Sequence, residues 1–156
     1  MADHQFEITL TEDVAAPAQA VFAHVTDFDD LARQLRERGA RVERLADTAA
    51  GMPAWRVRIA WRGVERDLRI EIAEQTADEL LRATVASAEF AGDIHVTVAA
   101  SGQKATRLTV TGRAGGATLP ARMLLQSLRL GQGRIAANLQ RRLRRFCDRI
   151  ERAARR

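Results

Sequence analysis

The sequence predicts an α+β fold in which one strand, two short helices and six antiparallel strands precede a long C-terminal helix. Three patterns carry this prediction. Apolar and polar residues alternate near the N-terminus, they alternate again on both sides of Gly63, and from Thr118 to Arg156 apolar residues recur at helical spacing. Alternation is typical of a strand with one buried face, whereas steps of three and four are typical of an amphipathic helix.

The N-terminal part is expected to form a strand followed by two short helices. Residues 6–11 alternate between apolar and polar, as in a half-buried strand. Pro17 suits the first turn of a helix, and the apolar residues after it keep helical spacing until Thr26 and Asp27 interrupt them. The second short helix is expected to end at Gly39, which fits a left-handed C-terminal cap.

A β-hairpin is expected between residues 55 and 72, because both halves alternate around a glycine. A two-residue turn at 62–63 would place Arg56 opposite Arg69. A slightly longer loop would instead pair Arg56 with Glu71, so both registers stay open.

In either register Arg66 faces the same side as Val64 and Leu68, which is the apolar side of the hairpin. A charge on that face is costly unless it is paired, hydrogen-bonded or close to solvent. Arg66 is therefore a candidate contact for the polar end of a ligand. The alternative is that its aliphatic stem carries the charge to water at the rim of the sheet.

The remaining strands are expected at 40–45, 79–88, 90–100 and 104–114. Their inward-facing side chains are predicted to be Leu81, Ala83, Val85, Ile94, Val96, Val98, Thr106, Leu108 and Val110. Gly92, Gly112 and Ala83 supply little volume at inward positions, which favours a cavity on this face of the sheet. Tight packing against the last helix is the alternative.

Residues 118–154 are expected to be helical, with room for a kink at the glycines of 131–133. The apolar stripe expected to be buried comprises Leu119, Met123, Leu124, Leu128, Ile135, Leu139, Leu143, Phe146, Cys147, Ile150 and Ala154. The other faces carry arginines, among which we expect an outer cationic face formed by Arg141, Arg142, Arg145, Arg149 and Arg152. Arg144 is assigned to these outer faces as well.

Composition supports one cytoplasmic domain spanning residues 1–156. The chain has no long apolar run, and residues 1–5 are polar, unlike a secretion signal. From Thr118 onward there are eleven arginines and two acidic residues, whereas the rest has fourteen basic and eighteen acidic residues. Cys147, the single cysteine, is expected to be a small buried hydrophobe within the helical stripe.

The order of elements resembles the START-like superfamily, which includes Bet v 1 allergens and bacterial polyketide cyclase/dehydrase and lipid-transport-like (SRPBCC) proteins. The resemblance rests on ITLTEDVAAPAQAVFAHVTDFDDL at positions 8 to 31 and on the closing amphipathic helix. It implies a helix-grip fold: a curved seven-stranded antiparallel sheet around a long C-terminal helix, with two short helices between strands 1 and 2. It also implies a hydrophobic cavity between sheet and helix for lipids, polyketides or other apolar molecules.

The sequence gives little support to catalysis or to a cofactor. There is no tyrosine, and the three histidines, His4, His24 and His95, are expected to be structural or solvated. No spacing of histidine and cysteine suits a metal, and no phosphate-binding, dinucleotide-binding or nucleophile-elbow motif is present. We therefore name no catalytic residue, no metal ligand and no cofactor.

Three functional hypotheses follow, and a binding protein is favoured over an enzyme. The first is binding of a small hydrophobic or amphipathic ligand between sheet and helix. The second is a surface adaptor whose arginine-rich helix face makes a weak contact with an anionic membrane or macromolecule; low aromatic content argues against nucleic acid. The third is a polyketide cyclase or dehydratase. The residues expected to bind the ligand are Trp55, Val57, Ile59, Arg66, Leu68, Ile70, Val96, Leu108, Val110, Leu124 and Leu128.

Overall fold

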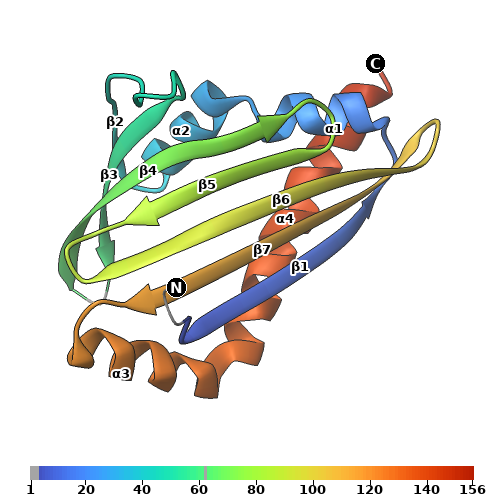
Figure 1. Ribbon diagram of the computed structural model, residues 1–156. Coiled ribbons are helices and arrows are strands. Elements are labelled where there is room, and N and C mark those ends of the chain that lie inside the picture. Colours follow the sequence, from blue (N-terminus) through green and yellow to red (C-terminus); the bar gives the residue numbers. More distant parts are fainter. Residues whose placement is uncertain (1–3, 62) are drawn as a thin grey trace.

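A computed structural model describes residues 4–61 and 63–156 and contains one seven-stranded antiparallel sheet (Figure 1). The strand order is β1-β7-β6-β5-β4-β3-β2, so the chain folds back beside its first strand with its last one. The strands are β1 (Phe6–Val14), β2 (Arg41–Arg44), β3 (Ala54–Trp61), β4 (Val64–Thr76), β5 (Leu80–Ala86), β6 (Phe90–Gly102) and β7 (Ala105–Gly116). This arrangement, with a long C-terminal helix and two short helices after β1, confirms the predicted helix-grip fold.

Two short helices connect β1 to β2, as the sequence predicts. These are α1 (Ala18–Val25) and α2 (Phe28–Glu37). The Asp27 side chain accepts a hydrogen bond from the backbone N–H of Asp30 and thereby caps α2. Gly39 has a φ of 94°, which agrees with its predicted role as a left-handed cap.

The β3–β4 hairpin adopts the shorter of the two registers left open by the sequence. Trp61 pairs with Val64, and Arg58 pairs with Asp67. The Nε of Arg58 lies 2.8 Å from a carboxylate oxygen of Asp67. Arg56 consequently lies opposite Arg69, but each guanidinium is paired with a carboxylate elsewhere. Residue 62 itself lies outside the described residues, while Gly63 has the positive φ that a tight hairpin turn demands.

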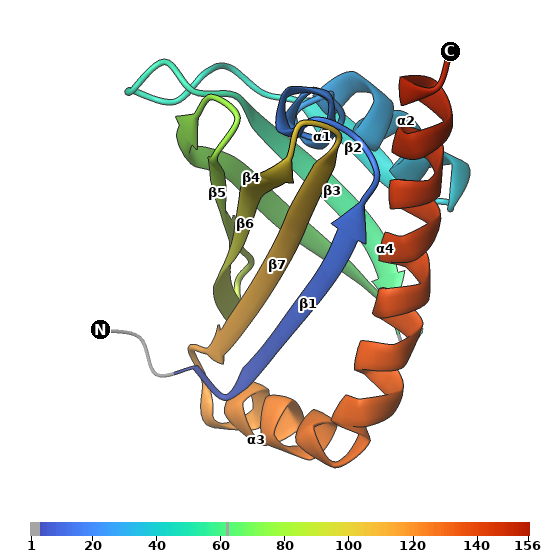
Figure 2. The ribbon, with the colours of Figure 1, turned by 90° about the vertical axis from the view of Figure 1, so that its right-hand side faces the viewer.

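The C-terminal region is helical but is not one straight helix. It consists of α3 (Leu119–Leu128), a short 3-10 turn η1 (Arg129–Gly131) and α4 (Gln132–Ala154). The predicted kink at residues 131–133 is centred slightly earlier, at η1, and is a sharp change of direction. α3 runs along one end of the sheet, and α4 then runs alongside the sheet toward its other end (Figure 2). The helix that grips the sheet therefore begins at residue 132.

The core is formed where α4 meets the inner face of the sheet and α1. Cys147 and Ile150 of α4 are fully buried together with Val14 and Leu108. The thiol of Cys147 is buried as predicted, and this burial raises its pKa to about 11. The stripe prediction is wrong at Leu119, Met123 and Ala154, which are exposed to solvent, whereas Leu124 and Leu128 of α3 are half-buried.

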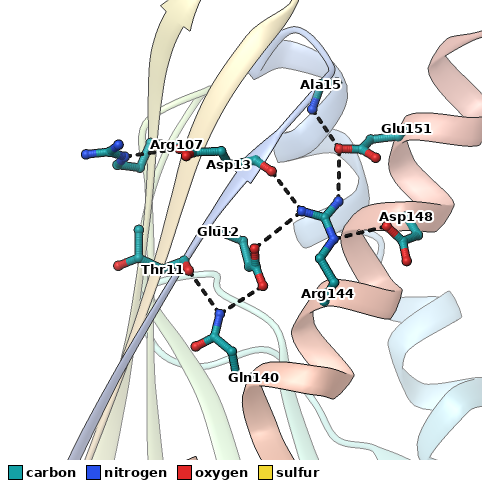
Figure 3. A network of polar contacts seen from close by, with 9 residues as sticks. All are labelled: Thr11, Glu12, Asp13, Ala15, Arg107, Gln140, Arg144, Asp148 and Glu151. Carbon is teal, nitrogen blue, oxygen red and sulfur yellow. Dashed lines mark hydrogen bonds and ion pairs between the residues drawn. The ribbon is translucent and has the colours of Figure 1, made fainter. Parts of the chain in front are cut away.

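A polar network fastens α4 to β1 and to the segment after it (Figure 3). Arg144 contacts Glu12 of β1 at 3.3 Å and, on its own helix, Asp148 at 3.0 Å and Glu151 at 2.9 Å. Burial opposes the charge of Arg144, but hydrogen bonds to Glu151 and Asp148 outweigh it and raise its pKa. Arg144 was assigned to the outer faces of the helix; it faces β1 instead, because its guanidinium bridges carboxylates on both elements.

Arg149, which is expected on the outer cationic face, is exposed there but also has partners within the protein. Its guanidinium donates a hydrogen bond to the side-chain oxygen of Gln34 on α2, with the atoms 2.9 Å apart. It also lies over the ring of Phe146, 5.7 Å from the ring centroid. Arg149 thus links α4 to α2 while it remains exposed, and Arg141, Arg142, Arg145 and Arg152 are exposed as predicted.

Candidate ligand-binding cavity

An apolar cavity of about 320 Å³ lies between the sheet, α2 and α4. Its walls come from strands β2 to β7 and from helices α1, α2 and α4, all contributing apolar side chains. The lining residues are Val25, Phe28, Leu31, Ala32, Leu35, Val42, Trp55, Val57, Ile70, Ile72, Leu81, Ala83, Ile94, Val96, Leu108, Val110, Leu143 and Phe146. We refer to this space as the larger cavity.

Each wall follows from the local pattern of the sequence. Alternate residues of β3 to β7 point to the same side. Six residues of the inward set predicted from the alternation form the floor: Leu81, Ala83, Ile94, Val96, Leu108 and Val110. On α2, Phe28, Leu31, Ala32 and Leu35 have the spacing of one helical face and cover the space from the other side. The Phe28 ring packs against Trp55, with ring centroids 5.1 Å apart, and fixes α2 over β3.

A smaller cavity of about 280 Å³ adjoins the larger one at Ile94, which lines both. It lies between β1, β6, β7 and α4, and its wall includes Leu68 and Leu139. Gly112 faces this space between Ile8 and Ile94, and a Cβ added there would meet nothing within 4 Å. The missing side chain therefore helps to create the volume.

The smaller cavity differs from the larger one in having polar residues in its wall, including Ser87 and Asp93. The Oδ1 atom of Asp93 is buried and has no hydrogen-bond partner among the described residues. A buried carboxylate oxygen without a partner is energetically costly, but Asp93 has the same parity on β6 as the outward-facing His95, so its side chain lies on the outer face of the sheet and not in the cavity.

The structure divides the eleven residues predicted from the sequence to bind the ligand. Six line the larger cavity: Trp55, Val57, Ile70, Val96, Leu108 and Val110. Leu68 lines the smaller cavity. Ile59, Arg66, Leu124 and Leu128 line neither one.

The four residues outside the cavities have two physical explanations. Leu124 and Leu128 belong to α3, which the turn at Arg129–Gly131 directs away from α4. Ile59 pairs with Arg66 near the hairpin turn, beyond the part of β3 and β4 that the cavity reaches.

Arg66 faces the concave side, as its parity predicts, but protein groups occupy most of its surroundings. Its Nη1 lies 3.4 Å from a carboxylate oxygen of Glu89, and its guanidinium lies 5.4 Å from the ring centroids of both Trp61 and Phe90. The buried Nε finds no hydrogen-bond partner within residues 4–61 and 63–156. Because Phe90 lines the smaller cavity, Arg66 lies directly behind its wall.

The sequence reasoning missed the contributions of α2 and α4 to the larger cavity. Phe28, Leu31 and Leu35 carried a helical apolar pattern but were assigned only to the fold. Leu143 and Phe146 were placed in the buried stripe without a role in the cavity. The signal that could have found them is the i, i+3, i+4, i+7 spacing on α2, which must face the same inner surface as the strands.

His24 and His95 line neither cavity. The Nδ1 of His24 lies 2.9 Å from the backbone oxygen of Ala20, and His95 is on the outer side of β6, between inward-facing Ile94 and Val96. Within the described residues, no three histidine, cysteine, aspartate or glutamate side chains gather closely enough to hold a metal ion. None of the described helices has the length and apolar character needed to cross a membrane.

Comparison with known proteins extends over nearly the whole chain. Residues 5–155 match the family described as polyketide cyclase / dehydrase and lipid transport. A search of curated proteins gave no significant match. Among solved structures, the Zhui aromatase/cyclase from Streptomyces sp. R1128 has a TM-score of 0.68 and 16% identity over 94% of this chain and 93% of that one.

Two further solved structures resemble this chain. A START superfamily protein from Mycobacterium smegmatis has a TM-score of 0.62 and 17% identity, covering 92% of this chain and 99% of that one. A protein from Thermus thermophilus has a TM-score of 0.65 and 22% identity, covering 95% and 99% of the two chains. At these identities the likeness establishes the START-like fold.

Proposed function

This chain belongs to the polyketide cyclase/dehydrase and lipid transport family, and on that premise we propose that it binds one small hydrophobic or amphipathic molecule in the two adjoining cavities. The observation that carries the proposal is the larger cavity itself. Eighteen apolar residues surround a volume of about 320 Å³. Small-molecule pockets in proteins have about 300–1,000 Å³ and are lined mainly by apolar side chains.

The two cavities suggest an elongated ligand with one apolar and one more polar end. The apolar part would fill the larger cavity, and the ligand would pass Ile94 to reach Ser87 at the wall of the smaller one. Arg66 would act through Phe90, whose ring it contacts, by holding that part of the smaller cavity's wall in place. Ile59, Leu124 and Leu128 have no place in this proposal.

A cyclase or dehydratase receives less support than a binding protein. Acid–base catalysis requires a titratable group within hydrogen-bond reach of the reacting atoms. The residues that line the larger cavity are apolar throughout, and Cys147 is buried with a pKa raised to about 11 by that burial. The titratable residues that border the smaller cavity, Asp93 and Arg113, are paired at outward-facing positions of β6 and β7.

Titration with a fluorescent fatty-acid probe tests the proposal. We expect saturable binding at micromolar concentration, one probe per chain. Val110→Phe, which fills the larger cavity from β7, should weaken binding at least about tenfold because the apolar part of the probe loses its space.

Thr109→Phe is the matched control, because it adds the same ring one residue earlier on the outer face of β7. It should leave probe affinity unchanged within about twofold. Equal affinity of both variants, with both folded by circular dichroism, would contradict binding in the larger cavity.

A series of unlabelled fatty acids tests the role of the smaller cavity. Gly112→Leu places a side chain in that space, so it should weaken the longer members and leave the shorter ones bound. Thr111→Leu, on the opposite face of the same strand, is the control. Unchanged affinity of the longer members would show that the ligand does not extend past Ile94.

A further inference from the structure

Three large apolar side chains project into solvent from α3 and η1. Leu119, Met123 and Leu130 are 67%, 60% and 93% exposed. The first two lie on the opposite side of α3 from Ala121 and Leu125, which are buried. We call the three exposed residues the α3 stripe. Exposed apolar residues that gather on one surface mark an interaction site more often than isolated ones.

The charged residues of the chain segment that carries the α3 stripe all have the same sign. Arg122, Arg129 and Arg134 are exposed in the same segment, and no acidic residue stands between Asp93 and Asp148 in the sequence. An amphipathic surface with leucine or methionine flanked by arginines suits a negatively charged partner that also offers an apolar layer.

We propose that the α3 stripe docks onto the surface of an anionic lipid bilayer, with the apolar side chains entering the interface and the arginines contacting lipid phosphates. A second copy of the chain is a poorer partner. A symmetric dimer through this face would bring the arginines of both copies together without a carboxylate from the same segment to pair them. Nucleic acid is also poorer, since α3 has no aromatic residue on which a base could stack.

The position of α3 in the fold agrees with this proposal. The helix spans one end of the molecule, and the C-terminus of α4 lies at the other end (Figures 1 and 2). The stripe can therefore lie flat on a surface while the rest of the protein projects away. The outer arginines of α4, which the sequence suggested for such a contact, lack this property because the apolar stripe of α4 is used in the core.

Co-sedimentation with vesicles tests the proposal without any ligand in the cavity. We expect binding to vesicles that contain phosphatidylglycerol and none to pure phosphatidylcholine vesicles, with binding falling steeply as salt shortens the Debye length to about 8 Å. Replacing the stripe by L119Q/M123Q/L130Q should weaken binding at least about tenfold. R129Q/R134Q should weaken vesicle binding by about 25-fold, because the loss of each arginine weakens it by about fivefold.

R155Q/R156Q is the matched control, because it removes the same charge at the opposite end of the molecule. It should change vesicle binding by less than about threefold. Equal losses in both arginine variants would overturn the proposal, since net charge alone would then explain binding. Unchanged vesicle binding of the stripe variant would also overturn the proposal. The same holds if the native chain binds no vesicles but sediments as a dimer that the stripe variant abolishes.

Probe binding by the stripe variant separates this proposal from the function proposed above. Leu119, Met123 and Leu130 line neither cavity, so the variant should bind the fatty-acid probe in solution as the native chain does. Loss of both probe and vesicle binding would indicate a disturbed fold and would contradict the placement of the stripe outside the core.

Discussion

Helices α3 and α4 carry the same kind of periodic apolar pattern, yet only α4 uses it in the core. Cys147 and Ile150 of α4 are fully buried, whereas Leu119 and Met123 of α3 are mostly exposed. The difference does not follow from hydrophobicity, since α3 is the more apolar of the two helices. Periodicity establishes that a segment is an amphipathic helix, and the direction in which the chain runs decides what covers the apolar face.

The polar contacts that fix the two helices explain their different directions. α4 is tied along its length to β1, where Gln140 and Arg144 contact side-chain and backbone oxygens. α3 is tied near its start, where Thr118 caps the helix and Arg122 donates to the backbone oxygen of Gly116. Gln132 then donates to the backbone oxygen of Glu7 and anchors the turn between the helices.

The largest expected effect is the difference in stability between the two apolar faces. Ile150→Ala should lower the free energy of unfolding by about 2–5 kcal/mol, because a fully buried side chain loses its contacts and leaves a cavity. Met123→Ala should change it by less than about 0.5 kcal/mol, as expected at an exposed position. Urea denaturation measures both values, and equal losses would show that α3 is covered as well.

A smaller effect is expected from the network between α4 and β1. Arg144→Ala should lower the free energy of unfolding by about 1–3 kcal/mol, because Glu12 and Glu151 are left partly buried without their partner. Arg145→Ala, at the exposed neighbouring position, should cost less than about 0.5 kcal/mol. If the two variants unfold at the same urea concentration, the network does not hold α4 in place.

The same network makes stability depend on pH at the acidic end. The backbone N–H of Ala15 donates to Glu151, and together with Arg144 it lowers the pKa of this carboxyl below its ordinary 4.5 despite burial. A pKa that is lower in the folded state stabilises the protein above the unfolded value, and this contribution is lost as pH falls through the folded value. Native protein should therefore lose more stability than Glu151→Gln between about pH 5 and the folded pKa. Parallel acid curves for both proteins would contradict this assignment.

The sequence predicted the fold well because its decisive signals are local. Alternation placed the strands other than β2, and the hairpin turn could be assigned to within two alternative registers. Gly39 and Asp27 marked the limits of α2. The change of direction at Arg129–Gly131 was not predictable in the same way, because two glycines permit a bend but only contacts with β1 and β7 select its angle.

The cavity was predictable only where it depends on strand parity. Val57, Val96 and Leu108 follow from the alternation alone, and they do line the larger cavity. Which helix closes a cavity depends on packing between distant segments, and for that reason Leu124 and Leu128 were proposed in place of Leu143 and Phe146. The parity of Arg66 was correct, but its pairing with Glu89 depends on the turn between β5 and β6.

Chemical labelling gives the most direct measure of the contrast between α3 and α4, with almost no change in stability. Dilute hydrogen peroxide should convert Met123 to the sulfoxide in the native protein, since most of its side chain is exposed. Cys147 on α4 should resist iodoacetamide at pH 8, because its thiol is buried and its pKa is raised to about 11. Mass spectrometry of the two peptides reads both reactions, and denaturant is the control that should release Cys147. Alkylation of native Cys147 as fast as in denaturant would mean that α4 leaves the sheet readily. The contrast between a buried α4 and an exposed α3 would then not hold in solution.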